Sequence, residues 1–338
     1  MRFTLRLAFV LGLALALVVA TSCGDDGASR DLDSAGNGRA PIPQDAQASD
    51  ADGDAPVSTM RFAHLAPGVG PVDFCYQGVR KGTFVGPVLG GGGAAPAPTD
   101  AGDADNDDLE DDPLDAGADD AGPPRSASYR TVSTYLVLQA AGPITIAVLP
   151  AGATSCTNAL VTADVTLDPG KLFTVALFER RADAGPATLE LGAFIDDRTT
   201  APDKARVRVI HAALGTADVT SAGPIGVRAV ASKTTVLADR VEPRRAASAS
   251  EAVAVDGLGY VTAPPVPPPT SLAIGPASSD GADAGFDPWQ SQSADLDLRG
   301  DSLHTAFVLT GPTESTFEVL WCADRTTSGD QTTCTLVR

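Results

Sequence analysis

Two stretches decide the fold of this chain: MRFAHLAPG (Met60–Gly68), followed by Val72-Asp73-Phe74, and VRVIHAA (Val207–Ala213), followed by Ala217-Asp218-Val219. Both place Arg and His at the same spacing and an Asp further along. Two later pairs of segments match in the same order: Leu167–Thr174 with Leu298–Thr305, and Leu189–Asp196 with Phe317–Asp324. Three matched blocks in one order predict an internal duplication.

The apolar residues inside each copy alternate with polar ones. Val161, Ala163, Val165 and Leu167 are separated by single polar residues, which is typical of a strand with one buried face. Pro and Gly turn signals bound these short segments, and no amphipathic stretch of helix length follows the first 22 residues. The sequence therefore predicts an all-β protein of two β-sandwich domains in tandem, residues 57–199 and 204–338, joined by a polar link.

Two segments are too polar to bury a core. Residues 24–56 and 86–128 are rich in Asp, Ala, Gly and Pro, so we expect them to be disordered, the second as an acidic insert within the first domain. The formal net charge of the whole chain is -19. A polyanion repels nucleic-acid phosphate, and no basic cluster interrupts it, so nucleic acid is excluded as a partner.

The N-terminus reads as an export signal. Arg2 and Arg6 precede an apolar run, Leu7–Val19, and three small residues lead to Cys23. This arrangement resembles a bacterial lipoprotein signal (residues 1–22), which implies a lipid anchor on Cys23 and a disordered linker over residues 23–56. An ordinary secretory signal that leaves a free thiol is the alternative. Gly24 after the cysteine favours the outer membrane of a Gram-negative bacterium over the inner one.

The other four cysteines form an even set in an exported chain, which favours disulfides. Three connectivities are possible. We expect Cys75 with Cys156 and Cys322 with Cys334, because this choice places one bond in each domain. Without a Cys-x-x-Cys motif and with only 3 His, the sequence gives no reason to expect a metal site or a cofactor.

The opening strands with Arg61 and His64 or Arg208 and His211, and the turn at Pro169-Gly170, resemble a bacterial extracellular family called domain of unknown function 4397 (DUF4397). The likeness extends over both copies. It implies immunoglobulin-like or transthyretin-like sandwiches at the cell surface and brings no activity with it.

Five residues are candidates for ligand contact. His64 with Asp73 and His211 with Asp218 recur in both copies, although a scaffolding role explains such repetition equally well. Trp289 lies in an irregular region and is the one aromatic residue that we single out for ligand contact.

Two further motifs have weak support. Gly300-Asp301-Ser302-Leu303 spells the signature of a family of serine esterases, but no His follows His304, so a triad is not expected. The stretch Asp103–Asp112 begins like a calcium loop but lacks its Gly and final Glu, which favours a solvated spacer.

These observations favour a non-catalytic surface lipoprotein that acts as a structural or interaction module, with the membrane and an envelope protein or glycan as partners. A carbohydrate- or calcium-binding module is the alternative, and a serine hydrolase is the least favoured interpretation.

Overall fold

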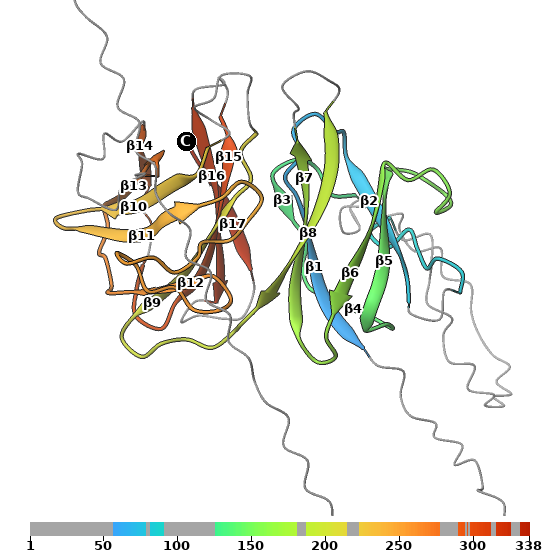
Figure 1. The fold of residues 1–338 in the computed structure, drawn as a ribbon, viewed down its shortest axis with the longest axis horizontal. Helices are drawn as coiled ribbons and strands as arrows, with labels where there is room; N and C mark the ends of the chain where they lie inside the picture. The colour runs from blue at the N-terminus through green and yellow to red at the C-terminus, as the bar shows by residue number, and fades with distance from the viewer. Residues whose placement is uncertain are drawn as a thin grey trace, which may run out of the picture. The chain divides into compact units, whose positions relative to one another are not determined.

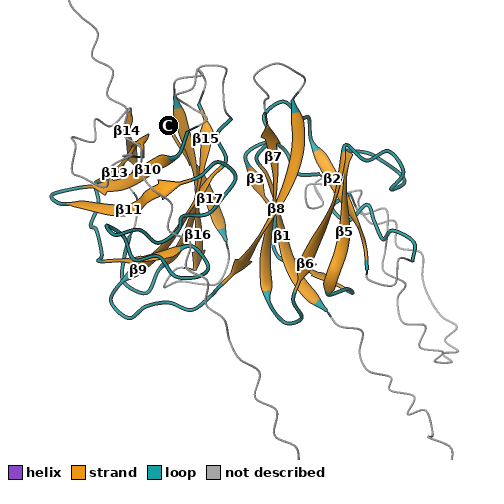
Figure 2. Ribbon diagram, viewed as in Figure 1, coloured by secondary structure: helices purple, strands orange, loops and turns teal. Residues whose placement is uncertain are grey.

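The fold is all-β, as predicted, and every regular element in the described part of the chain is a strand (Figure 2). The computed structural model describes residues 57–78, 82–90, 126–180, 187–214, 223–277, 290–294, 296, 298–311, 316–325 and 332–338. None of these residues belongs to a helix that could span a membrane.

The first half of the fold contains two sheets. Its strands are β1 (Ser58–His64), β2 (Val72–Gln77), β3 (Thr131–Val132), β4 (Leu136–Leu138), β5 (Gly142–Pro150), β6 (Val161–Leu167), β7 (Leu172–Arg180) and β8 (Thr188–Asp196). Strands β2, β5 and β6 form sheet I, and sheet II runs in the order β3-β1-β7-β8 with β4 also paired to β1. Strands β1 and β7 are parallel, whereas the other neighbours are antiparallel.

The second half repeats this plan. Its strands are β9 (Ala205–His211), β10 (Ile225–Val230), β11 (Thr234–Val241), β12 (Tyr260–Ala263), β13 (Thr270–Pro276), β14 (Gln290–Ala294), β15 (Leu303–Thr310), β16 (Phe317–Arg325) and β17 (Thr333–Val337). Sheet III has the order β12-β9-β15-β16-β17, and sheet IV has the order β11-β10-β13-β14. No sheet mixes strands of the two halves among the described residues (Figure 1).

Three apolar cores join the four sheets. One lies between sheets I and II and includes Phe62, Phe74 and Val175. Another lies between sheets III and IV, where Trp321 and Val227 are buried. The third core lies between sheets II and III, so residues of the two halves share one buried interior.

The central strands of sheets II and III, such as β7, β9 and β15, are therefore buried on both faces. In β7 the side chains of Phe173 and Val175 enter the core of the first half, while Ala176 and Phe178 enter the core between the halves. Strand β6 alternates between buried and exposed positions as the sequence predicts, but β7 is buried almost throughout. Near-continuous burial is the pattern of a strand covered on both sides.

The two halves use the same strand register. Arg61 of β1 lies opposite Thr174 of β7, and Arg208 of β9 lies opposite Thr305 of β15, both in parallel ladders. Among the described residues, two strands of the second half have no counterpart in the first. These are β11, beside β10 in sheet IV, and β17, beside β16 in sheet III, whereas β8 is the outermost strand of sheet II.

The segment predicted to be a disordered insert is ordered at both ends. Residues 86–90 turn back onto β2, where the amide of Val88 bonds the carbonyl of Phe74, and Ala127 bridges Val72. Val88 also packs against the first core, so the fold extends beyond the boundaries that composition predicts. The remaining residues of the insert, 91–125, lie outside the described residues, as do residues 1–56.

The polar link between the halves is tied to the second half. The guanidinium of Arg206 donates to the carboxylate of Asp197 at 2.9 Å and to the carbonyl of Thr199 at 2.6 Å. These bonds hold the link against β9, so it is not a free tether.

Candidate functional site: reciprocal ion pairs between the halves

A buried interface joins sheets II and III. Its apolar part, which we call the interface cluster, contains Ala63, Leu65, Ala176, Phe178, Ile210, Ala212, Phe307, Leu309, Leu320 and Cys322. These side chains come from the outer faces of β1, β7, β9, β15 and β16, except that Leu65 and Ala212 directly follow β1 and β9. A single sandwich would expose them to solvent, so the two halves depend on each other for burial.

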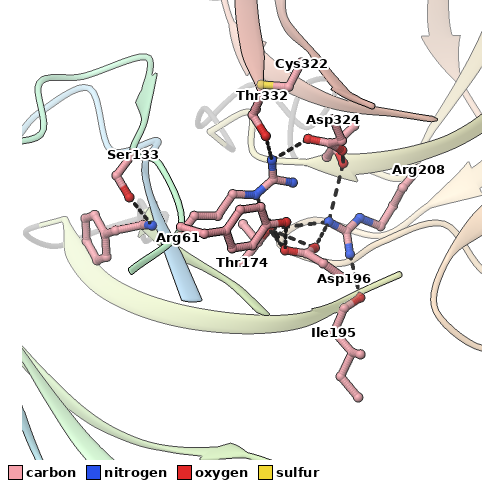
Figure 3. Close-up of polar contacts among 12 residues, drawn as sticks. Arg61, Ser133, Thr174, Ile195, Asp196, Arg208, Cys322, Asp324 and Thr332 are labelled. Carbon is pink, nitrogen blue, oxygen red and sulfur yellow. Dashed lines mark hydrogen bonds and ion pairs between the residues drawn. The ribbon is translucent and has the colours of Figure 1, made fainter. Parts of the chain in front are cut away.

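Two arginines cross this interface in opposite directions (Figure 3). Arg61 of the first half pairs with Asp324 of the second, and Arg208 of the second half pairs with Asp196 of the first. Both arginine side chains are fully buried, and the aspartate side chains are 3% and 5% exposed. Each half therefore supplies one arginine and one aspartate to the other, as two-fold related surfaces do.

A threonine beside each arginine adds further polar contacts. The Oγ1 of Thr174 accepts a bond from Nε of Arg61 at 2.8 Å and donates to the carboxylate of Asp196 at 2.7 Å. In the second half, Thr305 donates to Asp324 at 2.5 Å. The hydroxyls thus connect the two ion pairs into one network.

A tyrosine covers each arginine. The guanidinium of Arg61 lies 5.2 Å from the ring centre of Tyr135, and that of Arg208 lies 4.9 Å from Tyr260. The hydroxyl of Tyr135 also donates to Asp196 at 2.8 Å. A cation over an aromatic face is favourable, more so where water is excluded.

A second reciprocal pair lies nearer the solvent. Arg130 of the first half pairs with Glu318 of β16, and Arg244 of the second half pairs with Glu190 of β8 at 3.0 Å. Both arginines adopt a left-handed backbone, with φ of 67° and 61°, and their amides bond the carbonyls of His64 and His211. The local conformation that positions these arginines is thus the same in both halves.

Burial and charge act against each other in the network. Burial favours the neutral form of Asp196, but the charges of Arg208 and Arg61 outweigh it and lower the pKa of that carboxyl. Burial likewise opposes the charge of Arg61, yet the carboxylates of Asp324 and Asp196 raise its pKa. Burial raises the pKa of Tyr260 to about 12. Arg61, Arg208 and Asp196 are therefore charged at neutral pH.

The network is incompletely satisfied. Nη2 of Arg61 and Nε of Arg208 are buried and have no hydrogen-bond partner among the described residues. A buried ion pair has a large desolvation cost, which its Coulombic attraction and hydrogen bonds offset. Because some of these hydrogen bonds are missing, the offset is smaller. The clearest consequence of the arrangement is specificity, because a shift of sheet II against sheet III would leave buried charges unpaired.

The two histidines that the sequence suggested as ligand contacts instead hold the local backbone in place. Nε2 of His64 bonds the carbonyl of Gly70 at 3.0 Å, and Nε2 of His211 bonds that of Gly223 at 3.1 Å, while each Nδ1 accepts the amide two residues on. Each ring thereby fixes the loop after its strand. Burial lowers the pKa of His64 and takes that of His211 to about 4, so both rings are neutral at pH 7.

Asp73, the candidate ligand contact beside His64, is bound to the chain's own backbone. Asp73 accepts bonds from the amides of Leu89 at 2.7 Å and Gly90 at 2.6 Å, and so anchors the start of the insert. The other two candidate ligand contacts, Asp218 and Trp289, lie outside the described residues. In the described part of the chain, no group of three or more His, Cys, Asp or Glu side chains could hold a metal ion.

The serine of the esterase-like motif is a buried turn residue. Ser302 is 4% exposed, and its Oγ donates to the carbonyl of Arg299 at 2.7 Å. Nε2 of His304 lies 2.9 Å from the same Oγ. Because the hydroxyl has one proton and the carbonyl takes it, His304 must be the donor in this contact and is not poised as a base.

Two disulfides join Cys75 to Cys156 and Cys322 to Cys334, the pairs expected from the sequence. The first connects β2 to the loop after β5 over a separation of 81 residues. The second ties β16 to β17 within one ladder.

Sequence reasoning missed the charged interface. The repeated blocks contain Arg61, Arg208, Asp196 and Asp324, yet the sequence pattern singles out only the histidines and the aspartates after them as candidates. The signal was available, because a charged residue repeated at a strand position flanked by apolar residues has to find a partner. Its partner, however, lies in the other copy, which no local pattern shows.

Fold and site together define a class: a tandem β-sandwich protein whose equivalent halves pack face to face through reciprocal ion pairs. The family model described as "Domain of unknown function (DUF4397)" matches residues 109–222. This single match extends from the acidic insert through β8 and β9, so it crosses the boundary between the halves. The matched region is similar to that family. It includes Arg208 and His211 but not Arg61 and His64, so the match does not extend over both copies. No curated protein matches the chain.

Proposed function

We propose that this chain is a non-catalytic lipoprotein of the bacterial cell envelope whose two sandwiches act as one rigid interaction module. The observation that carries the proposal is the pair of buried ion pairs between Arg61 and Asp324 and between Arg208 and Asp196. Two domains joined only by a linker would move independently. Here the surface between the two domains is apolar, and its buried ion pairs fix the position of one sheet against the other.

A rigid pair of sandwiches is suited to presenting a binding surface at the end of a tether. The segment before β1 is long and polar, and the Cys23 signal would attach its start to the membrane. The two disulfides are consistent with an oxidising compartment outside the cytosol. A stiff body on such a tether would hold its loops and sheet edges in fixed relation to one another for a partner in the envelope.

The network supports a mechanical role rather than a chemical one. Its carboxylates are bound by guanidinium and hydroxyl groups, and its side chains are buried away from any reactant. General acid-base work needs a group within reach of a substrate. The arrangement is suited to holding two sheets in one register.

Cell fractionation tests the anchor. In a Gram-negative host, the full-length protein should sediment with the membranes and Cys23→Ala should be released to the soluble periplasmic fraction. Ser29→Ala, in the same polar segment, is the matched control and should stay with the membranes. If Cys23→Ala is retained as strongly as the wild type, the lipoprotein assignment is wrong.

A further inference from the structure

The two halves differ at the outer edge of sheets II and III. In the second half, β17 lies against β16, and Trp321 pairs with Thr335. The equivalent strand of the first half, β8, has β7 on one side, and no described residue forms a backbone ladder on its other side. Trp321 corresponds to Ala193, since Phe194 and Cys322 lie opposite the equivalent threonines Thr174 and Thr305.

The free edge of β8 presents backbone hydrogen-bonding groups outward. The carbonyl of Leu177 in β7 accepts the amide of Leu65, so Leu177 and, two residues earlier, Val175 direct their peptide groups toward β1. Their antiparallel partners, Leu191 and Ala193, are therefore in non-hydrogen-bonded pairs with β7. The amides and carbonyls of Leu191 and Ala193 consequently face the open edge.

A hollow of about 580 Å³ lies along this edge. One wall is Ala193–Ile195 of β8, and the other is formed by residues 245–249 and 255–259 of the second half. Phe194 and Ala246, which line the hollow, also pack against the interface cluster. The hollow is thus continuous with the buried interface between the halves.

Strand β17 shows what such a place accepts. Its Cys334 and Leu336 side chains pack against the interface cluster, as Val132 of the first half does. Ala246 is the counterpart of Val132, because the residues after them, Ser133 and Ala247, donate their amides to equivalent carbonyls of β1 and β9. The hollow beside β8 is therefore the counterpart of the space that β17 fills.

We propose that the edge of β8 is a binding site for an extended segment of a partner protein, which adds to sheet II as an antiparallel strand. Its ladder would use the peptide groups of Leu191 and Ala193, and apolar side chains at two alternate positions would face Phe194 and Ala246. Adding a strand to an open sheet edge is a common mode of peptide recognition. The inference rests on the proposed interaction role and names its site and partner class.

Two other occupants fit less well. The polar segments of this chain, residues 24–56 and 91–125, lack alternating large apolar residues and cannot fill the apolar side of the hollow. A second copy pairing through its own β8 would bring a whole sandwich against residues 245–259, which border the edge. A single extended strand fits the hollow more readily than an edge strand that belongs to a whole folded domain.

A peptide probe tests the proposal without use of the membrane anchor. The probe is a fluorescent peptide of residues 332–338 with Cys334→Ala, and fluorescence anisotropy reports its binding to the full-length protein in detergent. We expect saturable binding that Ala193→Pro weakens by about fivefold or more, because proline removes one edge amide and the lost hydrogen bond has a net value of about 1 kcal/mol. Proline is tolerated where an edge amide faces solvent, so the variant should fold.

Ala193→Ser is the matched control, since it keeps the amide, and it should bind as the wild type does. A probe that also carries Leu336→Asp should lose binding. Hydrogen exchange of the wild-type protein should show slower exchange at Leu191 and Ala193 when the probe is bound, which is informative even if Ala193→Pro fails to fold.

Absent binding, or equal binding by Ala193→Pro, would overturn the site. A dimer of the protein that Ala193→Pro dissociates would assign the edge to a second copy instead and would also overturn the proposal. Either result can occur while Cys23 still anchors the protein, so failure here is distinguishable from failure of the proposed function.

Discussion

Arg61 and Arg208 are equivalent residues that exchange partners: each forms its ion pair with the aspartate of the opposite half. Such reciprocity is characteristic of an isologous dimer interface, and here it occurs within one chain. The outer pairs of Arg130 with Glu318 and Arg244 with Glu190 follow the same rule. A duplicated sandwich thus packs against its own copy as two subunits would.

Removing one inner arginine should be costly. Arg208→Met leaves Asp196 as a buried carboxylate whose remaining cation is Arg61, with its Nε 3.5 Å away. Breaking a buried pair from one side costs about 3–5 kcal/mol. Urea unfolding should show a loss of this size in the free energy of unfolding.

The double variant Arg208→Met/Asp196→Leu should be no less stable than Arg208→Met alone, because it leaves no unpaired charge at this position. Arg240→Ala serves as the surface control. Arg240 pairs with Glu242, but the two side chains are 48% and 51% exposed, so its loss should change stability by less than about 1 kcal/mol. Equal effects of Arg208→Met and Arg240→Ala would refute a buried network.

Mild acid should destabilise the fold through His211. Burial lowers the pKa of this ring from 6.5 to about 4, so the unfolded chain takes up a proton below pH 6.5 that the folded chain does not. The free energy of unfolding should therefore fall by about 3 kcal/mol between pH 6.5 and pH 4 on account of this residue. His64, whose pKa is also lowered, acts in the same direction.

His211→Gln provides the comparison, since its amide can still donate to the carbonyl of Gly223. Urea midpoints measured across this pH range should vary less steeply in the variant than in the wild type. Identical slopes would show that His211 does not carry the pH dependence. Asp196 acts in a lower window, because its depressed pKa costs stability only as pH falls below about 3.8.

The two disulfides should differ in their contribution to stability. The bond between Cys75 and Cys156 closes 81 residues, and the bond between Cys322 and Cys334 closes 12. Loop-closure entropy then gives about 4.5 and about 3 kcal/mol respectively. Cys75→Ala/Cys156→Ala should accordingly lower the melting temperature more than Cys322→Ala/Cys334→Ala. The reverse order would indicate that strand pairing between β16 and β17 outweighs chain entropy.

Ser302 should behave as a turn residue. Ser302→Ala removes the bond to the carbonyl of Arg299 and should cost about 1 kcal/mol of stability. Hydrolysis of p-nitrophenyl acetate should be the same for the variant and the wild type. An esterase activity that disappears in Ser302→Ala would contradict the proposed non-catalytic function.

The sequence by itself determined the features that arise from local patterns. Period-two alternation, as in Val161–Leu167, requires a strand with one buried face, and the matched blocks placed Arg61 and Arg208 at equivalent positions. Composition predicted a disordered acidic insert over residues 86–128, but its two ends are ordered, because Asp73 and the first core fix residues that look polar and loop-like in isolation.

Only the tertiary structure decided that the central strands of sheets II and III are buried on both faces, that Arg61 binds Asp324 across 263 residues, and that β8 has no counterpart of β17 among the described residues. A strand pattern records that a side chain is buried but not which surface covers it. Which surface covers a side chain depends on how well two whole sheets complement each other, and this is settled only when the two halves pack together.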